Sequence, residues 1–151
     1  MLEMTFPEEK KEDINMPSLN HSYICSQILR QLFTFEQIEA LTELTLDIDK
    51  GLTPDICVYS ADIIKPNFSR DVNKLSQMPL LSIEVISASQ NIQMLLEESE
   101  RMVKAGIRAV WTVEPFTRTI FVTTEQGEQI FYNQAISFES ISVDFKKIFA
   151  G

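Results

Sequence analysis

The sequence is poor in the residues that most soft-metal and redox sites use. It holds two cysteines and one histidine among 151 residues. Cys25 and Cys57 do not form a CxxC pair and show no metal-ligand spacing. Cys25 falls in an expected helix and Cys57 in an expected strand. Both are therefore predicted to fill core space as small hydrophobic side chains.

Positive charge is also scarce. The chain has 13 Lys and Arg residues against 22 Asp and Glu residues, which gives a net charge of −9. Phosphate binding needs concentrated Lys and Arg. This composition excludes a protein whose whole surface binds nucleic acid, although it leaves room for a local basic groove.

Long apolar runs are missing. No stretch approaches the length needed to span a bilayer. The N-terminal segment MLEMTFPEEKKEDINMP is acidic and lacks the apolar core of a signal peptide. We therefore expect a cytoplasmic protein without a membrane partner. GxGxxG, P-loop, nucleophile-elbow and HExxH motifs are absent too, so small-molecule enzymes of those classes have no support.

What is present is the composition of a globular protein, with 44% hydrophobic and 23% charged residues. The chain is long enough to bury a core without disulfides or metal. We predict a flexible acidic N-terminal segment over 1–17 and a single domain over 18–151.

The hydrophobic patterns alternate between helix and strand. A helix is predicted over 17–33 with Ser18 or Asn20 as N-cap, and 36–43 would extend it or form a turn. A second helix is predicted over 91–105, with an N-cap from the preceding SASQ and Gly106 at its C-terminus. Strands are predicted at 43–49, 55–59, 80–86, 109–113, 119–124 and 128–133, with a short terminal element at 141–149.

The strand–helix–strand unit at 80–113 reads as a parallel crossover. Together with the hairpin that follows it, this order predicts an α/β domain in which helices flank a mixed β-sheet.

Two carboxylates stand out by position. Asp55 opens a strand directly after Pro54, and Glu84 lies within the apolar run LLSIEVI. A buried charge must be paired, protonated or bound to a cation. If the two strands are neighbours, both side chains would converge on a site suited to Mg²⁺. Alternatively, Asp55 accepts bonds from turn amides and Glu84 pairs with a buried Arg or Tyr.

Several blocks of the sequence match a known family in the same order. They are TPDICVYSAD, PLLSIEVISAS, MVKAGIRAVWTVEP and TIFVTT, and His21 matches a histidine common at the start of the family's first helix. From about Asn20 to Phe149 the chain resembles the Uma-two family, also named domain of unknown function 820. That family consists of restriction-endonuclease-like proteins of the PD-(D/E)XK nuclease superfamily.

The resemblance implies a restriction-endonuclease-like core in which Asp55 and Glu84 are catalytic acids that bind Mg²⁺ or Mn²⁺, with DNA as the substrate. In the superfamily a Lys lies two residues after the strand Glu, and Ile86 stands at that place here. Members of the family usually carry the Lys on the following helix, with an Asp one turn earlier. Those places fall on Glu98 and Met94, so both family residues are missing.

This departure predicts a degenerate nuclease site. Glu98 would add negative charge beside two carboxylates and a polyanionic substrate. Arg101, one turn further on, can lean towards Glu98 but cannot act as a base. The chain is therefore predicted to be a metal-dependent DNA endonuclease with weakened or lost cleavage. The alternative is a catalytically inactive, homodimeric binding or assembly module on the same fold.

The roles of three other features stay open. His21 would either act near the metal site or, as is more common for a histidine at a helix start, serve as a surface or capping residue. Trp111 is expected in the core. The loop 60–79 would either face the substrate or be an ordinary solvated connection. Aromatic residues around the hairpin fit either the core or a dimer surface: Phe116, Phe121, Phe131 and Tyr132.

Overall fold

The computed structural model describes residues 18–151. The predicted N-terminal segment 1–17 lies outside the described residues, so the proposed domain boundary stays a prediction.

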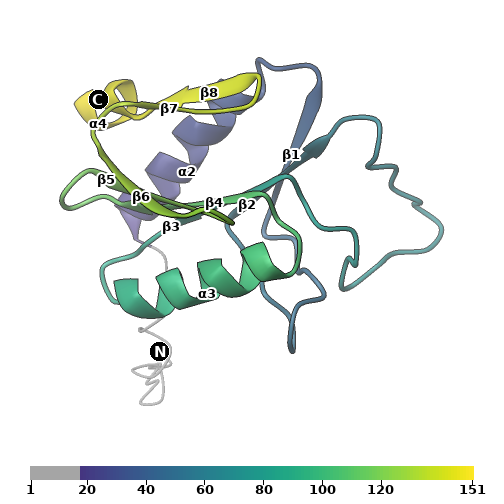
Figure 1. The fold of residues 1–151 in the computed structure, drawn as a ribbon. Coiled ribbons are helices and arrows are strands. Elements are labelled where there is room, and N and C mark those ends of the chain that lie inside the picture. The colour runs from purple at the N-terminus through teal and green to yellow at the C-terminus, as the bar shows by residue number, and fades with distance from the viewer. Residues whose placement is uncertain (1–17) are drawn as a thin grey trace, which may run out of the picture.

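The described chain is built on one six-stranded mixed sheet (Figure 1). The strands follow one another across the sheet in chain order, and every neighbouring pair is antiparallel except β3 and β4. The predicted parallel crossover is therefore confirmed. The strands are β1 (Ile38–Thr42), β2 (Ile56–Ser60), β3 (Leu81–Val85), β4 (Ala109–Glu114), β5 (Thr119–Thr124) and β6 (Gly127–Tyr132).

Helices cover both faces of this sheet (Figure 1). One face carries α2 (Leu19–Leu32), the two-stranded sheet of β7 (Ala135–Phe138) and β8 (Ile141–Asp144), and the terminal helix α4 (Phe145–Ala150). The other face carries α3 (Ile92–Lys104), which packs against β4 and β5. This is the predicted arrangement of a mixed sheet flanked by helices.

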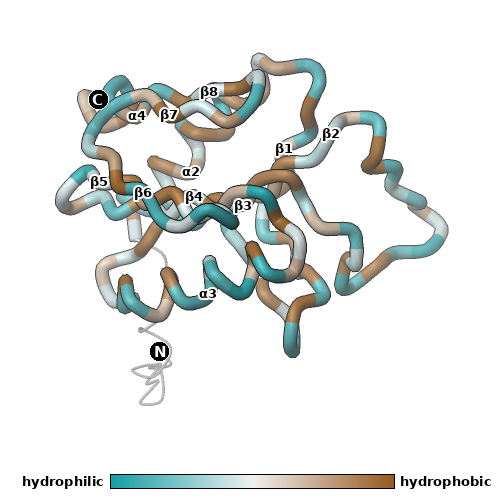
Figure 2. The backbone as a smooth tube through the Cα atoms, in the orientation of Figure 1, coloured by the Kyte–Doolittle hydropathy of each residue, from teal (hydrophilic) through white to brown (hydrophobic). Residues whose placement is uncertain are grey.

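The larger core lies on the α2 face. Trp111 is 1% exposed there and packs edge-on against Phe145, with ring centroids 6.0 Å apart. Its predicted core position is confirmed. Hydrophobic residues concentrate in the central strands, whereas hydrophobic and hydrophilic residues alternate along α3 (Figure 2). The second core, under α3 and the segment that follows β1, includes Met102, Ile107 and the buried Cys57.

Local capping fixes both ends of α3. The Asn91 side chain accepts hydrogen bonds from the backbone N–H groups of Gln93 and Met94, so Asn91 is the N-cap. The predicted cap within SASQ was wrong, because the cap is Asn91, the residue that follows this motif, and the helix begins at Ile92. At the other end Gly106 adopts φ +117°, a conformation that side-chain-bearing residues rarely take, and the helix stops there as predicted.

Two local predictions were wrong. Residues 36–43 neither extend α2 nor form only a turn, since most of them build the edge strand β1. Residues 43–49 alternate like a strand but form only isolated bridges, from Leu46 to Leu52 and Leu75. Their alternation reflects the burial of Leu46 and Ile48 beneath the neighbouring loop. Strand β7 was not predicted, and the terminal element 141–149 proved to be a strand followed by a helix.

None of the helices formed by residues 18–151 is long and apolar enough to cross a membrane.

Candidate active site

The sheet topology brings Asp55 and Glu84 to one place. Strand β2 runs antiparallel to β3 with Ile56 opposite Ile83. Continuing this register by one residue sets Asp55, just before β2, opposite Glu84, near the end of β3. The parity of β3 turns Ile83 towards the α2 face and Glu84 towards the α3 face. The convergence expected from the sequence is therefore present.

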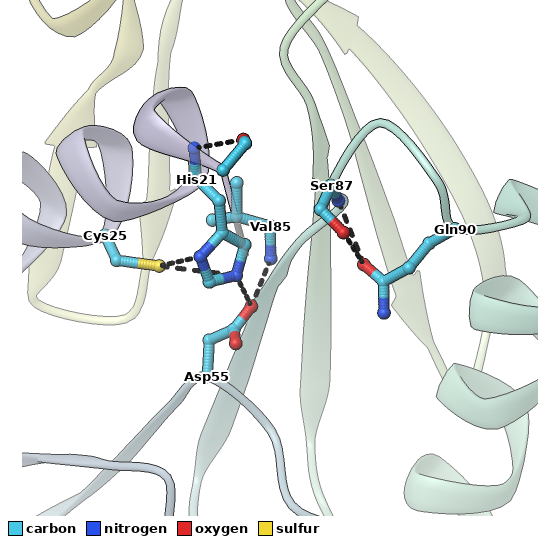
Figure 3. A network of polar contacts seen from close by, with 7 residues as sticks. His21, Cys25, Asp55, Val85, Ser87 and Gln90 are labelled. Carbon is cyan, nitrogen blue, oxygen red and sulfur yellow. Dashed lines mark hydrogen bonds and ion pairs between the residues drawn. The ribbon is translucent and has the colours of Figure 1, made fainter. Parts of the chain in front are cut away.

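Asp55 is held by three different parts of the fold. Its Oδ2 accepts a hydrogen bond from the backbone N–H of Val85 at 2.7 Å and lies 3.0 Å from Nε2 of His21 (Figure 3). Its carbonyl oxygen accepts the N–H of Glu43 at 3.1 Å. Strand β3 and helix α2 thus hold the carboxylate through Oδ2, while Glu43, just after β1, holds the backbone of Asp55.

Glu84 is a partly buried carboxyl beside other acids. Desolvation raises its pKa well above the usual range, and the negative charges of Asp55 and Glu98 raise it further. The side chain is hydrogen-bonded to Asp55, while a backbone hydrogen bond from Asp55 acts in the opposite direction. Within residues 18–151 no ion pair involves Glu84. The alternative in which Glu84 pairs with a buried Arg therefore has no support in the described chain.

Helix α3 directs Glu98 towards this pair. Glu98 is partly buried, and its burial raises its own pKa, while the charge of Arg101 lowers it. Its charge in turn acts on Glu84, so the third carboxylate belongs to the same electrostatic cluster. Met94, one turn earlier, is 61% exposed and adds no polar group.

Arg101 does not neutralise the cluster by a direct contact. Its Nε lies 3.2 Å from Oδ2 of Asp49, and both side chains are about half exposed. Arg101 acts on Glu98 only through its charge. The side chain of Arg101 therefore pairs with Asp49, and it makes no ion pair with Glu98 in the described chain.

His21 lies inside the site. Its backbone N–H is capped by Ser18 Oγ at 3.2 Å, and its ring is only 12% exposed because it reaches Asp55. The favoured interpretation of His21 as a surface residue was wrong. The hydrogen bond to Asp55 raises the pKa of His21, burial lowers it, and the charges of Asp55 and Glu43 raise it again, with a net upward shift.

Cys25 lies one helical turn after His21 and extends the cluster. Its Sγ is 4.0 Å from both ring nitrogens of His21 (Figure 3). Burial raises the pKa of the Cys25 thiol to about 12, helped by the charges of Asp55, Glu84 and Glu43. The side chain is half-buried against the core, as predicted, but its sulfur also faces the acid site.

A local polar contact lies in the segment that follows β3. Gln90 Oε1 accepts bonds from the N–H of Ser87 at 2.9 Å and from its hydroxyl at 3.1 Å (Figure 3). This contact lies in the connection between β3 and α3.

Two members of the cluster were missed by sequence reasoning. Cys25 was assigned to core packing alone, although its spacing of four residues from His21 places both on one helix face. Glu43 belongs to the segment that was predicted incorrectly. No local signal in the sequence connects Glu43 to Asp55, because their contact depends on the pairing of β1 with β2.

Comparisons with known proteins agree with this architecture. Residues 12–144 match the model of the Uma2 family, whose description is "Putative restriction endonuclease". The fold is similar to the crystal structure of a "putative nuclease belonging to DUF820" from Anabaena variabilis ATCC 29413. That similarity has a TM-score of 0.75 at 22% identity and covers 89% of this chain and 83% of that one. It confirms the predicted restriction-endonuclease-like fold.

A second similarity is weaker. It is to a cryo-EM structure of a DrdV–DNA complex, with a TM-score of 0.48 and 12% identity. It covers 93% of this chain but only 12% of that one. No curated protein matches this chain.

Proposed function

Because this chain belongs to the Uma2 family of restriction-endonuclease-like proteins, we propose that it is a metal-dependent DNA endonuclease in which Glu98 strongly weakens cleavage. Asp55 and Glu84 bind Mg²⁺ or Mn²⁺ and are the catalytic acids. The observation that carries this proposal is the environment of Glu84. Its carboxyl lies partly buried among two further carboxylates, and no cationic group contributes to its raised pKa.

The donor set fits a hard divalent cation. Mg²⁺ and Mn²⁺ prefer carboxylate oxygens and are commonly held by one or two of them, with water and substrate phosphate completing the shell. Asp55 and Glu84 supply such oxygens from adjacent strands. Val85 and His21 contact Asp55 through Oδ2, and the Glu84 side chain is hydrogen-bonded to the same Asp55 carboxyl group.

When bound, the ion supplies charge neutralisation at the phosphate and a more acidic water. The chain's own residues position these groups. His21 and the Val85 amide hold the Asp55 carboxylate in one orientation. Glu84 provides the opposing oxygen from β3, where the charge of Glu98 on α3 acts on it.

Glu98 acts against cleavage. A lysine at this place would orient the attacking water and offset charge on the phosphate, whereas a carboxylate repels both the phosphate and its two acidic neighbours. The same charge strengthens cation binding. We therefore expect a site that holds metal well and cuts slowly or not at all.

The loop 60–79 contributes little to the proposed DNA contact. It leaves the last residue of β2 and returns at the first residue of β3, which are the strand ends opposite to Asp55 and Glu84. A five-residue strand separates those ends by roughly 16 Å. Lys65, Arg70 and Lys74 are exposed on this loop, a pattern that favours an ordinary solvated connection.

One observation favours the alternative of an inactive homodimeric assembly module. Strand β6 is an edge of the sheet, and its residues are exposed on both faces apart from the half-buried Phe131. Ile130 is 63% and Tyr132 62% exposed on it. Exposed edge strands with apolar side chains are ready to pair with another chain.

A plasmid-nicking assay with Mn²⁺ separates the two functions. The wild type is compared with Met94→Asp/Glu98→Lys and with the same double variant carrying Asp55→Asn. We expect little nicking by the wild type, a gain in the double variant, and loss of that gain once Asp55 is replaced. A folded double variant that shows no gain contradicts the proposal and favours the assembly module.

A further inference from the structure

The start of α2 presents a second set of donors beside the acid pair. His21 and Cys25 lie four residues apart on one face of the helix, and Asp55 faces them from just before β2. One ligand atom from each residue lies within 4.8 Å of the other two (Figure 3). These three side chains combine a thiol, an imidazole and a carboxylate in one small volume.

We propose that His21, Cys25 and Asp55 form a binding site for a zinc-type divalent cation. Tetrahedral zinc with a Zn–S distance of about 2.3 Å and Zn–N and Zn–O distances of about 2.1 Å separates nitrogen from oxygen by roughly 3.4 Å and sulfur from nitrogen by roughly 3.6 Å. The corresponding separations from Nε2 of His21 are 3.0 Å to the Asp55 oxygen and 4.0 Å to the Cys25 sulfur. Each differs from the zinc value by roughly 0.4 Å, and the third separation, from sulfur to oxygen, is at most 4.8 Å here against roughly 3.6 Å in tetrahedral zinc.

Ligand chemistry separates this site from the proposed magnesium site. Thiolate and imidazole select zinc, cobalt and related ions, whereas Mg²⁺ takes oxygen ligands. Glu84 is on the side of the sheet that faces α3, while Cys25 comes from α2 on the other face. Asp55 lies between them and is the only ligand that the two sites share.

The site also has an open side. His21, Cys25 and Asp55 line a hollow of about 330 Å³ together with Ser22, Thr42 and Glu43. Three protein ligands with one open position are typical of exchangeable or catalytic zinc. Water or the Glu43 carboxylate takes that position, and binding releases the Cys25 thiol proton to solvent.

Sharing Asp55 makes the two ions compete. Zinc at His21 and Cys25 draws Asp55 away from Glu84 and lowers the occupancy of the magnesium site. This consequence rests on the proposed function, whereas zinc binding itself does not.

The test uses the purified full chain after removal of metal with a chelator. Cobalt serves as the probe, because a thiolate-to-cobalt charge-transfer band appears only when a cysteine is a ligand. We expect the band in the wild type and in Cys57→Ala, which removes the other thiol, and its loss in Cys25→Ser. Persistence of the band in a folded Cys25→Ser variant, or its absence in the wild type, overturns the proposal.

Zinc affinity gives a second readout. Competition with a chromophoric chelator should give one zinc per chain, and affinity should fall about tenfold or more in Cys25→Ser and in His21→Asn, since even partners outside the ligand shell cost that much. Ser22→Ala lines the same hollow without supplying a ligand and should bind like the wild type. Equal affinity in all four proteins contradicts the assignment.

One variant separates this proposal from the magnesium site. Glu84→Gln should keep the cobalt band while losing stabilisation by Mn²⁺. If Glu84→Gln loses stabilisation by Mn²⁺ and keeps the cobalt band, its effect is confined to the nuclease site. If the cobalt band is missing while stabilisation by Mn²⁺ is intact, the zinc proposal fails and the nuclease proposal is unaffected.

Discussion

At the scale of single residues, the site is defined by how His21 and Asp55 share a contact. The hydrogen bond to Asp55 is the largest influence on the pKa of His21, followed by burial, which acts in the opposite direction. Glu43 has the smallest effect of the four causes. The order of these effects can be measured, because His21 is the only histidine in the chain.

We expect the His21 ring in the metal-free protein to titrate above 6.5. Asp55→Asn should bring this pKa below 6.5, since burial then outweighs the remaining charge of Glu43. Glu43→Gln should lower it by less. The measurement is an NMR titration of the single imidazole, and an equal effect of the two variants would contradict the order of causes.

The same shift fixes the sign of a stability effect. Because the folded-state pKa of His21 is raised, its contribution to stability is fully present below pH 6.5 and is lost as the pH rises through the folded value. The difference in unfolding free energy between the wild type and His21→Asn should therefore be larger at pH 6 than at pH 9.

Glu84 should destabilise the metal-free protein near neutral pH. Its folded-state pKa is raised above 4.5, so the folded state loses stability relative to the unfolded state as the pH rises from 4.5 through the folded value. Glu84→Gln should then stabilise the protein at pH 8 by on the order of 1 kcal/mol, with a smaller gain at pH 5. Urea unfolding followed by the single buried Trp111 measures this difference.

A matched control and an added cation test the cause. Glu97→Gln removes an exposed carboxylate from α3 and should change stability little. Mn²⁺ should stabilise the wild type by mass action and leave Glu84→Gln unchanged. Equal stabilisation of both proteins by Mn²⁺ would argue against Glu84 as a ligand.

At the scale of elements, regular periodicity was a reliable guide and irregular segments were not. The apolar stripe of 91–105 and the run 80–86 predicted α3 and β3 correctly. The parallel pairing of β3 with β4 across α3 was also predicted correctly. Residues 43–49 alternate in the same way as a strand, yet they form only isolated bridges. Their alternation comes from the burial of Leu46 and Ile48 beneath a loop. Strand β1 is held by long-range pairing with β2, which local sequence does not encode.

The candidate site shows the same division. Asp55, Glu84 and Glu98 could be assigned from motif order and from helix counting, and the structure places them in one cluster. His21 was favoured as a surface or capping residue and Cys25 was given to the core, because their link to Asp55 crosses from a helix to a strand start 30 residues or more away. Only the assembled fold brings those segments together.

The N-cap of α3 should matter for both stability and site geometry. Asn91→Ala removes the side-chain acceptor for two backbone N–H groups and should cost about 1 kcal/mol of unfolding free energy. Asn91→Asp keeps an acceptor and should be close to neutral. Urea unfolding monitored by Trp111 measures both, and equal losses in the two variants would show that α3 does not depend on this cap.

At the scale of the whole molecule, negative charge works against the binding of DNA at the end of the sheet where the topology gathers the candidate catalytic residues. The sheet order gathers carboxylates from β2, β3 and α3 at one end, in a chain whose net charge is already −9. A polyanion approaching that end meets both the global charge and the local cluster. The two contributions can be separated, because α3 also carries an exposed carboxylate outside the cluster, Glu100.

Glu98→Lys and Glu100→Lys change the net charge of the protein by the same amount. If the local cluster controls DNA approach, Glu98→Lys should strengthen binding of a short duplex about tenfold or more in Ca²⁺, while Glu100→Lys gives only a small gain that disappears at 0.15 M salt. Fluorescence anisotropy across a salt series measures both. Equal gains with equal salt slopes would assign the effect to net charge alone. Glu98 would then lose its special place in the proposed function, because its position beside Asp55 and Glu84 would have no consequence for the substrate.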